Sequence, residues 1–284
     1  MTEDRSGRAE NRVLDILYFP CLCKEPKIPW HLSPDAWYKL YMNNPLAIAR
    51  TTLLEAPGIS DTQLQQIMDQ LVSSRVDAAD AYFQHSRLES WVLDDGIIKE
   101  GNHTIEQGAG LRAVSGEKTG FAYTEDLALG NLLQAAKSAR AITNAGQSGS
   151  IRVQSNSQPT SLYTQLNPLE SLQDDDKIAL MQRLDAIARA EDPRVLQVTV
   201  SLVAAHDIML VIDNQGQLAS DVRPLVRCNV QVIVEQNGRR EQGSAGGGAR
   251  SSMEFLLQED RATGYAREAV RQALVNLEAI DTPA

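Results

Sequence analysis

Residues 82–123 read YFQHSRLESWVLDDGIIKEGNHTIEQGAGLRAVSGEKTGFAY, and this stretch decides the fold of the chain. Apolar and polar residues alternate along it, which is the period of a strand with one buried face. Asp94-Asp95-Gly96 and Gly116 interrupt the alternation with residues that are typical of turns. We therefore predict strands over residues 79–86, 89–93, 97–100, 104–114 and 121–124.

Helical patterns flank these strands. Apolar residues recur at helical spacing over 60–75, and Ser60 with Gln63 fits a capping box. Similar reasoning predicts helices over 125–142, 174–190 and 264–280, and strands over 195–203, 208–212 and 225–234. Asn237-Gly238 follows the last strand and is a strong hairpin signal. Short antiparallel strands with helices on one face make the expected fold class α+β.

The chain is expected to form two such units. Residues 143–160 are rich in Gly, Ser, Asn and Gln and have little to bury, so we predict a linker there. This linker would separate an N-terminal α+β domain over 42–142 from a central α+β domain over 161–284.

Residues 1–41 differ from the rest because they are rich in aromatic residues, proline and cysteine. We expect a non-native or disordered extension, with translation starting at Met42. Cys21, Cys23 and His31 could be read as metal ligands. Structural zinc sites use four ligands in a recognised spacing, however, so we predict no metal site there.

Composition excludes several classes of function. The net charge of −10 argues against a nucleic-acid partner, whose phosphates attract Lys and Arg. No apolar run approaches the length of a membrane span, and the N-terminus lacks the pattern of a secretory signal. Three cysteines give no disulfide framework. We therefore expect a cytoplasmic protein without a membrane partner.

Five blocks of sequence occur in an order that is specific to one family. They are ESWVLDDGIIKEG (89–101), QGAGLRAVSGEKTGFAY (107–123), DVRPLVR (221–227), RREQGSAGGGAR (239–250) and AREAVRQALVNLEA (266–279). From about Met42 onward, the chain resembles the N-terminal half of a TldD-type protein of the TldD/PmbA metallopeptidase family.

This resemblance implies a zinc metallopeptidase whose H-E-x-x-x-H helix and a later cysteine bind zinc. The glutamate would act as general base on a zinc-bound water. It also implies a heterodimer with a PmbA/TldE-like partner and an unfolded or extended peptide as substrate. No H-E pair occurs in this sequence. We therefore predict no catalytic residue, no metal ligand and no cofactor in this chain, and zinc only for the full-length family member.

One glycine-rich segment is a candidate for ligand contact. Residues 243–250 (GSAGGGAR) are expected to form a loop, and consecutive glycines permit close approach of a backbone. We predict a substrate cleft there, and the alternative is a flexible turn before the last helix. The cleft candidates are Gly246, Gly247, Gly248 and Arg250.

Other polar residues are expected to have structural roles. His103 and His206 are predicted in loops, and His85 on the polar face of its strand. Cys228 is predicted in the core. The acidic pairs and triplets belong to turns and helix starts, where aspartate suits the backbone and the helix dipole. They are Asp94-Asp95 and Asp174-Asp175-Asp176.

Two functions follow from these expectations. In the first, the chain is the N-terminal portion of a TldD-like zinc metallopeptidase, forms the walls of a peptide channel and contacts the partner subunit, and is inactive alone. In the second, it is a non-catalytic peptide- or partner-binding module derived from the same family. An exposed sheet edge could then add an extended peptide as another strand.

Overall fold

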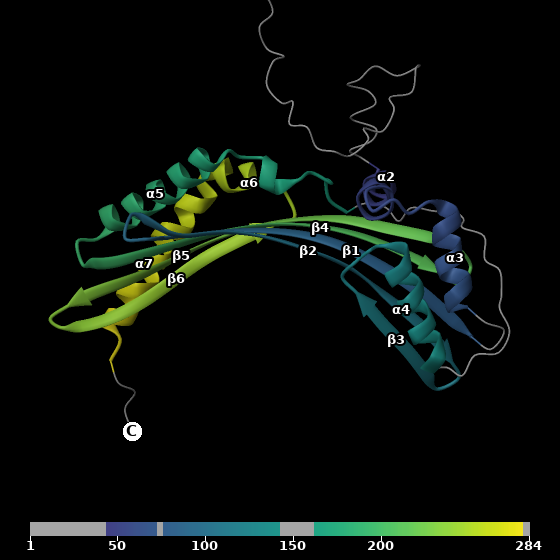
Figure 1. Ribbon diagram of the computed structural model, residues 1–284. Helices are drawn as coiled ribbons and strands as arrows, with labels where there is room; N and C mark the ends of the chain where they lie inside the picture. The colour runs from purple at the N-terminus through teal and green to yellow at the C-terminus, as the bar shows by residue number, and fades with distance from the viewer. Residues whose placement is uncertain (1–43, 73–75, 143–161, 281–284) are drawn as a thin grey trace, which may run out of the picture.

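The structure is a computed structural model that describes residues 44–72, 76–142 and 162–280. The predictions about the N-terminal extension and the linker lie outside these residues. One antiparallel sheet of six strands, in the order β3-β2-β1-β4-β5-β6, runs through the molecule (Figure 1). The strands are β1 (Ala78–Asp94), β2 (Ile97–Ser115), β3 (Lys118–Thr124), β4 (Val195–Asp213), β5 (Leu218–Gln236) and β6 (Arg239–Ala249).

The helices gather over the two ends of the sheet, and the α+β class is confirmed (Figure 1). At one end lie α2 (Pro45–Arg50), a π-helical turn (Thr51–Glu55), α3 (Asp61–Leu71) and α4 (Leu129–Ile142). At the other end lie α5 (Asp174–Glu191), α6 (Glu254–Leu257) and α7 (Arg261–Glu278), with short 3-10 turns at Pro168–Glu170 and Gln258–Asp260. Among the described residues, no helix is long and apolar enough to cross a bilayer.

The strands are longer than the sequence predicted. The two segments predicted over 79–93 form one strand, and the same holds for the segments predicted within β2 and within β4. The predicted gaps include polar residues such as Arg87 and His206, but backbone pairing continues through them, as in Arg87↔His206 and Leu88↔Ala205. Each buried backbone group needs a hydrogen-bond partner, and the neighbouring strand supplies one whatever the side chain is.

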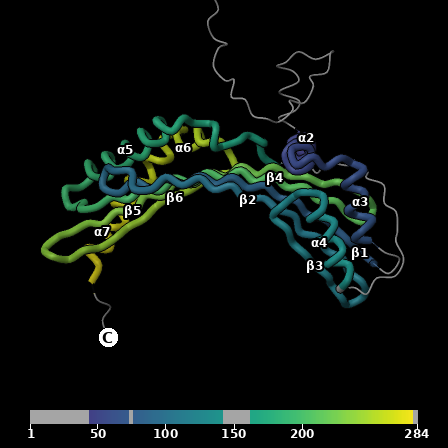
Figure 2. Tube along the Cα trace, viewed as in Figure 1, coloured from purple at the N-terminus to yellow at the C-terminus, as the bar shows by residue number. Residues whose placement is uncertain are grey.

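The two halves of the chain follow the same order of elements. The first half runs α3-β1-β2-β3-α4, and the second runs α5-β4-β5-β6 and then α6 and α7. The antiparallel pairing of β1 with β4 joins the two halves into one sheet. In Figure 2 the long strands pass continuously from one helix group to the other. The two predicted α+β units therefore share a single sheet.

Two hydrophobic clusters lie on the same face of this sheet. Phe83 and Leu210 belong to the cluster under α3 and α4, and Leu93 and Val200 belong to the cluster under α5 and α7. Alternate residues of a strand share a face, so these odd residues of β1 and even residues of β4 point the same way. The other face, which we call the open face, carries no helix among the described residues.

Local signals explain the helix ends. The predicted capping box is present, since the Ser60 side chain accepts from the Gln63 amide and the Gln63 side chain accepts from the Ser60 amide. Asp95 and Gly96 form the predicted turn between β1 and β2, and both have positive φ. Asp174, Asp175 and Asp176 occupy the first turn of α5, as predicted.

Helix α7 packs so closely on β6 that one strand position excludes any side chain. A Cβ atom on Gly243 would overlap the carbonyl oxygen of Ala269 and the backbone nitrogen of Ala273. We therefore expect Gly243→Ala to lower the free energy of unfolding by about 1 to 3 kcal/mol, measured by urea denaturation.

Gly264→Ala is the matched control, because Gly264 lies within α7 and a Cβ atom there meets nothing within 4 Å. This control should raise stability by about 0.5 to 1 kcal/mol, since alanine is the better helix former. Equal stability of Gly243→Ala and the unaltered chain would contradict the packing described here.

Candidate functional site

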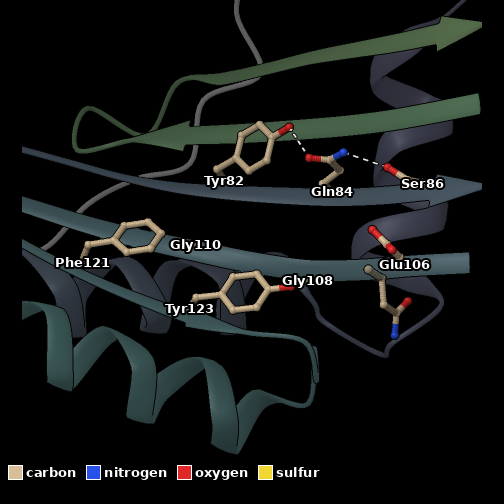
Figure 3. Close-up of a pocket in the computed structure, with 9 residues that line it drawn as sticks. Tyr82, Gln84, Ser86, Glu106, Gly108, Gly110, Phe121 and Tyr123 are labelled. Atoms are coloured by element: carbon tan, nitrogen blue, oxygen red, sulfur yellow. Dashed lines mark hydrogen bonds between the residues drawn. The ribbon is translucent and has the colours of Figure 1, made fainter.

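A hollow of about 310 Å³ lies on the open face, over β1, β2 and β3 (Figure 3). We call it the open-face pocket. Alternate residues of β1 and β3 reach it, as expected for one face of a pleated sheet, and β2 contributes the consecutive residues 106–108 as well as Gly110. Its lining consists of Tyr82, Gln84, Ser86, Glu106, Gln107, Gly108, Gly110, Phe121 and Tyr123.

Two glycines of β2 form the floor for two aromatic rings from β3. A Cβ atom on Gly108 would lie 2.6 Å from the Tyr123 hydroxyl oxygen, and one on Gly110 would lie 3.0 Å from the Phe121 ring. Both rings therefore lie against the β2 backbone, and a larger residue at either glycine would displace them. Each aromatic residue is nonetheless 58% exposed, so the outer ring faces meet solvent (Figure 3).

The β1 side of the pocket is polar. The Tyr82 hydroxyl donates to Gln84 Oε1 at 2.7 Å, and Gln84 Nε2 donates to Ser86 Oγ at 2.7 Å (Figure 3). Burial raises the pKa of Tyr82, with Arg223 opposing and Asp207 adding to the rise. Tyr82 is therefore a neutral hydrogen-bonding group at neutral pH.

A second hollow of about 180 Å³ continues the pocket toward β4. The two hollows share Ser86 and Glu106, and the second also reaches Asp207. Among the described residues, neither Glu106 nor Asp207 forms an ion pair or a side-chain hydrogen bond. These two carboxylates lie beside exposed aromatic rings, and Arg223, which pairs with Asp221, is the cross-strand neighbour of Asp207.

On the opposite face, a polar seam separates the two hydrophobic clusters. Arg87 of β1 pairs with Glu170 at 3.2 Å and is the cross-strand neighbour of His206 on β4. Nearby, Lys177 of α5 is 2% exposed and donates from Nζ to Glu89 Oε1 at 2.6 Å. This second pair joins α5 to β1. Both of its charges are largely removed from water, so loss of either partner would leave a buried charge unpaired.

The seam corrects two predictions about histidine. His206 lies within β4 and is 7% exposed, so its predicted loop position is wrong. His85 shares a face with Phe83, toward the helices, because residues two apart in a strand point the same way. Burial and the charge of Arg87 lower the pKa of His206 to about 4, and the same causes lower the pKa of His85.

The glycine run is also corrected, because it lies on strand β6 rather than in a loop. Cβ atoms on Gly246 and Gly248 would overlap carbonyl oxygens of β5, and one on Gly247 would overlap the Tyr265 hydroxyl. Arg250 stacks over the Tyr163 ring, 5.4 Å from its centroid. Close packing accounts for these glycines, and their place in a substrate cleft stays a prediction.

The described residues offer no zinc site. No group of three or more His, Cys, Asp or Glu within them could hold a metal ion. Cys228 lies in the core as predicted, where burial raises the pKa of its thiol to about 12. A thiol with so high a pKa is a poor source of the thiolate that zinc requires. The zinc that the sequence resemblance implies therefore does not fit these residues.

Comparison with known proteins identifies the family. Residues 79–143 match the model for the PmbA/TldA metallopeptidase domain 1, and residues 167–277 match that for the PmbA/TldA metallopeptidase central domain. The "Metalloprotease TldD homolog" of Haemophilus influenzae is 45% identical over 239 residues, which is 82% of this chain and 50% of the relative. The chain belongs to the TldD/PmbA metallopeptidase family.

A second curated relative in the TldD/PmbA family matches a similar share of this chain. The "Metalloprotease TldD homolog" of Buchnera aphidicola subsp. Schizaphis graminum is 36% identical and aligns with 84% of this chain and 50% of its own length. The chain thus spans about half the length of the curated relatives it matches. The predicted TldD-type resemblance is confirmed.

Solved structures share the fold. A proposed modulator of a DNA gyrase from Thermotoga maritima has a TM-score of 0.59 at 17% identity, over 72% of this chain and 46% of that one. TldE from Thermococcus kodakarensis has a TM-score of 0.54 at 11% identity, and the match covers 75% of this chain and 47% of TldE. Identities this low show the fold alone.

Sequence reasoning about this TldD/PmbA chain missed the open-face pocket. The sequence carried a signal for it. Gly108 and Gly110 are two residues apart on β2, and Phe121 and Tyr123 are two residues apart on the neighbouring strand β3. Glycines opposite aromatic residues on neighbouring strands indicate rings that lie over the backbone.

Acid should destabilise the seam. Because the pKa of His206 falls from 6.5 to about 4 on folding, the unfolded chain binds the extra proton between these values. Stability is then lost as the pH falls from about 6.5 to about 4, by up to about 3 kcal/mol. Urea denaturation across this range should show a shallower pH dependence for His206→Gln than for the unaltered chain.

His103→Gln is the control, since His103 is exposed whereas His206 is buried. His103 lies within β2 opposite Glu89, so its predicted loop position is also wrong. This control should keep the pH dependence of the unaltered chain. A His206→Gln profile that parallels the unaltered one would contradict a neutral, buried His206.

Proposed function

We propose that this chain forms the non-catalytic portion of a TldD-type zinc metallopeptidase that contacts the peptide substrate and the partner subunit. The observation that carries the proposal is the match to TldD homologues over about half of their length by a chain with no H-E pair. The zinc of the family does not fit the described residues, so we assign no hydrolytic step to them.

Exposed sheet edges support contact with an extended peptide. β3 pairs with residues 109–115 of β2, so the stretch of β2 before Ala109 has no strand on its outer side among the described residues. Unpaired backbone groups on such an edge can hydrogen-bond to an added strand with little regard to its sequence. This suits a peptidase that accepts unfolded segments.

The glycine run offers a second edge for substrate. Within the part of the chain that the structure describes, β6 is the outermost strand on its side, and Gly246, Gly248 and Arg250 are exposed. A strand without side chains lets another backbone approach closely. We therefore keep Gly246, Gly247, Gly248 and Arg250 as candidates for the wall of the peptide channel.

The partner in this proposal is a PmbA/TldE-type subunit. The support is the family membership and the fold that this chain shares with TldE from Thermococcus kodakarensis. The same sheet edges also favour the second function, in which the chain holds peptides or the partner subunit without taking part in cleavage.

Three measurements on the purified chain test the proposal. After dialysis, metal analysis should find no stoichiometric zinc, and an unfolded peptide should stay intact during incubation. Mixed with a TldE-type subunit, the chain should elute with it as a complex in gel filtration.

Chelator-sensitive cleavage with zinc bound at one per chain would refute the non-catalytic role. Separate elution of the two proteins would refute the role in subunit contact. Peptide binding without association to the partner would favour the second function.

A further inference from the structure

We propose that the open-face pocket binds the guanidinium group of an arginine carried by an extended peptide. This inference deepens the proposed function and rests on its peptide-contacting role, since it names the kind of side chain that the open face selects.

Charge is the first argument. Glu106 lines the pocket and Asp207 lines the adjoining hollow, and neither has an ionic partner among the described residues. Arg223 is the cross-strand neighbour of Asp207, and Arg112 lies on the same face of β2, but each is ion-paired with another carboxylate. Arg112 donates to Asp80 at 2.8 Å, and Arg223 donates to Asp221 at 2.6 Å. A cation entering this region therefore meets net negative charge.

The aromatic rings are the second argument. The rings of Phe121 and Tyr123 lie over Gly110 and Gly108, with their outer faces toward solvent (Figure 3). The face of an aromatic ring attracts a cation, and a planar guanidinium can stack on it. Lysine has no such planar group, which favours arginine as the occupant.

Hydrogen bonding is the third argument. A guanidinium has five N–H donors and no acceptor, so a site for it must be rich in oxygen atoms. The pocket supplies the Glu106 carboxylate and the hydroxyl oxygens of Ser86 and Tyr123. A carboxylate can accept two parallel hydrogen bonds from arginine, which fixes the orientation of the side chain.

The uncovered edge of β2 is the fourth argument, because a peptide bound along it would place an arginine side chain at the pocket. The pocket lies beside Glu106, Gln107 and Gly108, where β2 loses its neighbour β3. A peptide added along the uncovered part of β2 would present alternate side chains to the open face. An arginine at one of those positions reaches the pocket.

The test uses the full chain and two fluorescently labelled peptides. One is a glycine- and serine-rich peptide with two arginines at alternate positions, and its twin has citrulline in their place. Citrulline keeps the shape of arginine but is neutral. Fluorescence anisotropy at low salt should show that the arginine peptide binds about five-fold tighter or more. Added salt should weaken that preference.

Two variants and a control locate the binding. Glu106→Gln should remove the preference for arginine, and Tyr123→Leu should weaken binding of the arginine peptide. Glu100→Gln alters an exposed carboxylate of the same strand outside the pocket, and should leave the preference unchanged. Thermal unfolding of each variant checks that it is folded.

Equal affinity of the unaltered chain for the two peptides would overturn the inference, and this comparison needs no variant. An arginine preference that survives in folded Glu106→Gln would also overturn it. If the chain associates with the TldE-type subunit but binds the arginine and citrulline peptides equally, only the pocket assignment is contradicted. If the arginine preference depends on Glu106 but the chain does not associate with the TldE-type subunit, the subunit role is contradicted and the pocket assignment is supported.

Discussion

The antiparallel pairing of β1 with β4 is the constraint on which the rest of the structure depends. It runs from Asp80↔Asp213 to Asp94↔Thr199 and joins two halves that each consist of helices and three strands. Because the pairing is continuous, both hydrophobic clusters must lie on one face of the sheet, and the opposite face is left for the pocket. Among the described residues, the centre of the pairing lies between the two hydrophobic clusters, and there the chain places the polar seam around Arg87 and His206.

Most elements of the fold could be predicted because their signals are local. The capping box at Ser60, the Asp95-Gly96 turn and the helical period of α5 and α7 each depend on residues close together in the chain. The continuity of the long strands could not be predicted, because polar residues at their centres break the apolar alternation. Those centres are held by neighbouring strands that come from distant parts of the sequence.

The candidate site was harder to predict for the same reason. The glycine run signalled close approach of another group, and the structure shows that Tyr265 and the β5 backbone approach it. Sequence alone could not tell Tyr265 from a ligand, since α7 is a separate segment. The pocket depends on the pairing of β2 with β3, which sets the rings of Phe121 and Tyr123 over glycine.

Hydrogen exchange of the native chain, resolved by residue, tests the single shared sheet most directly. If β1 and β4 hold the halves together, amides at the centres of both strands should exchange only with the slowest, global unfolding reaction. Arg87 and His206 lie at those centres and are the amides to follow. Fast exchange at both, with the two ends of the sheet opening independently, would show two separate units and contradict the account.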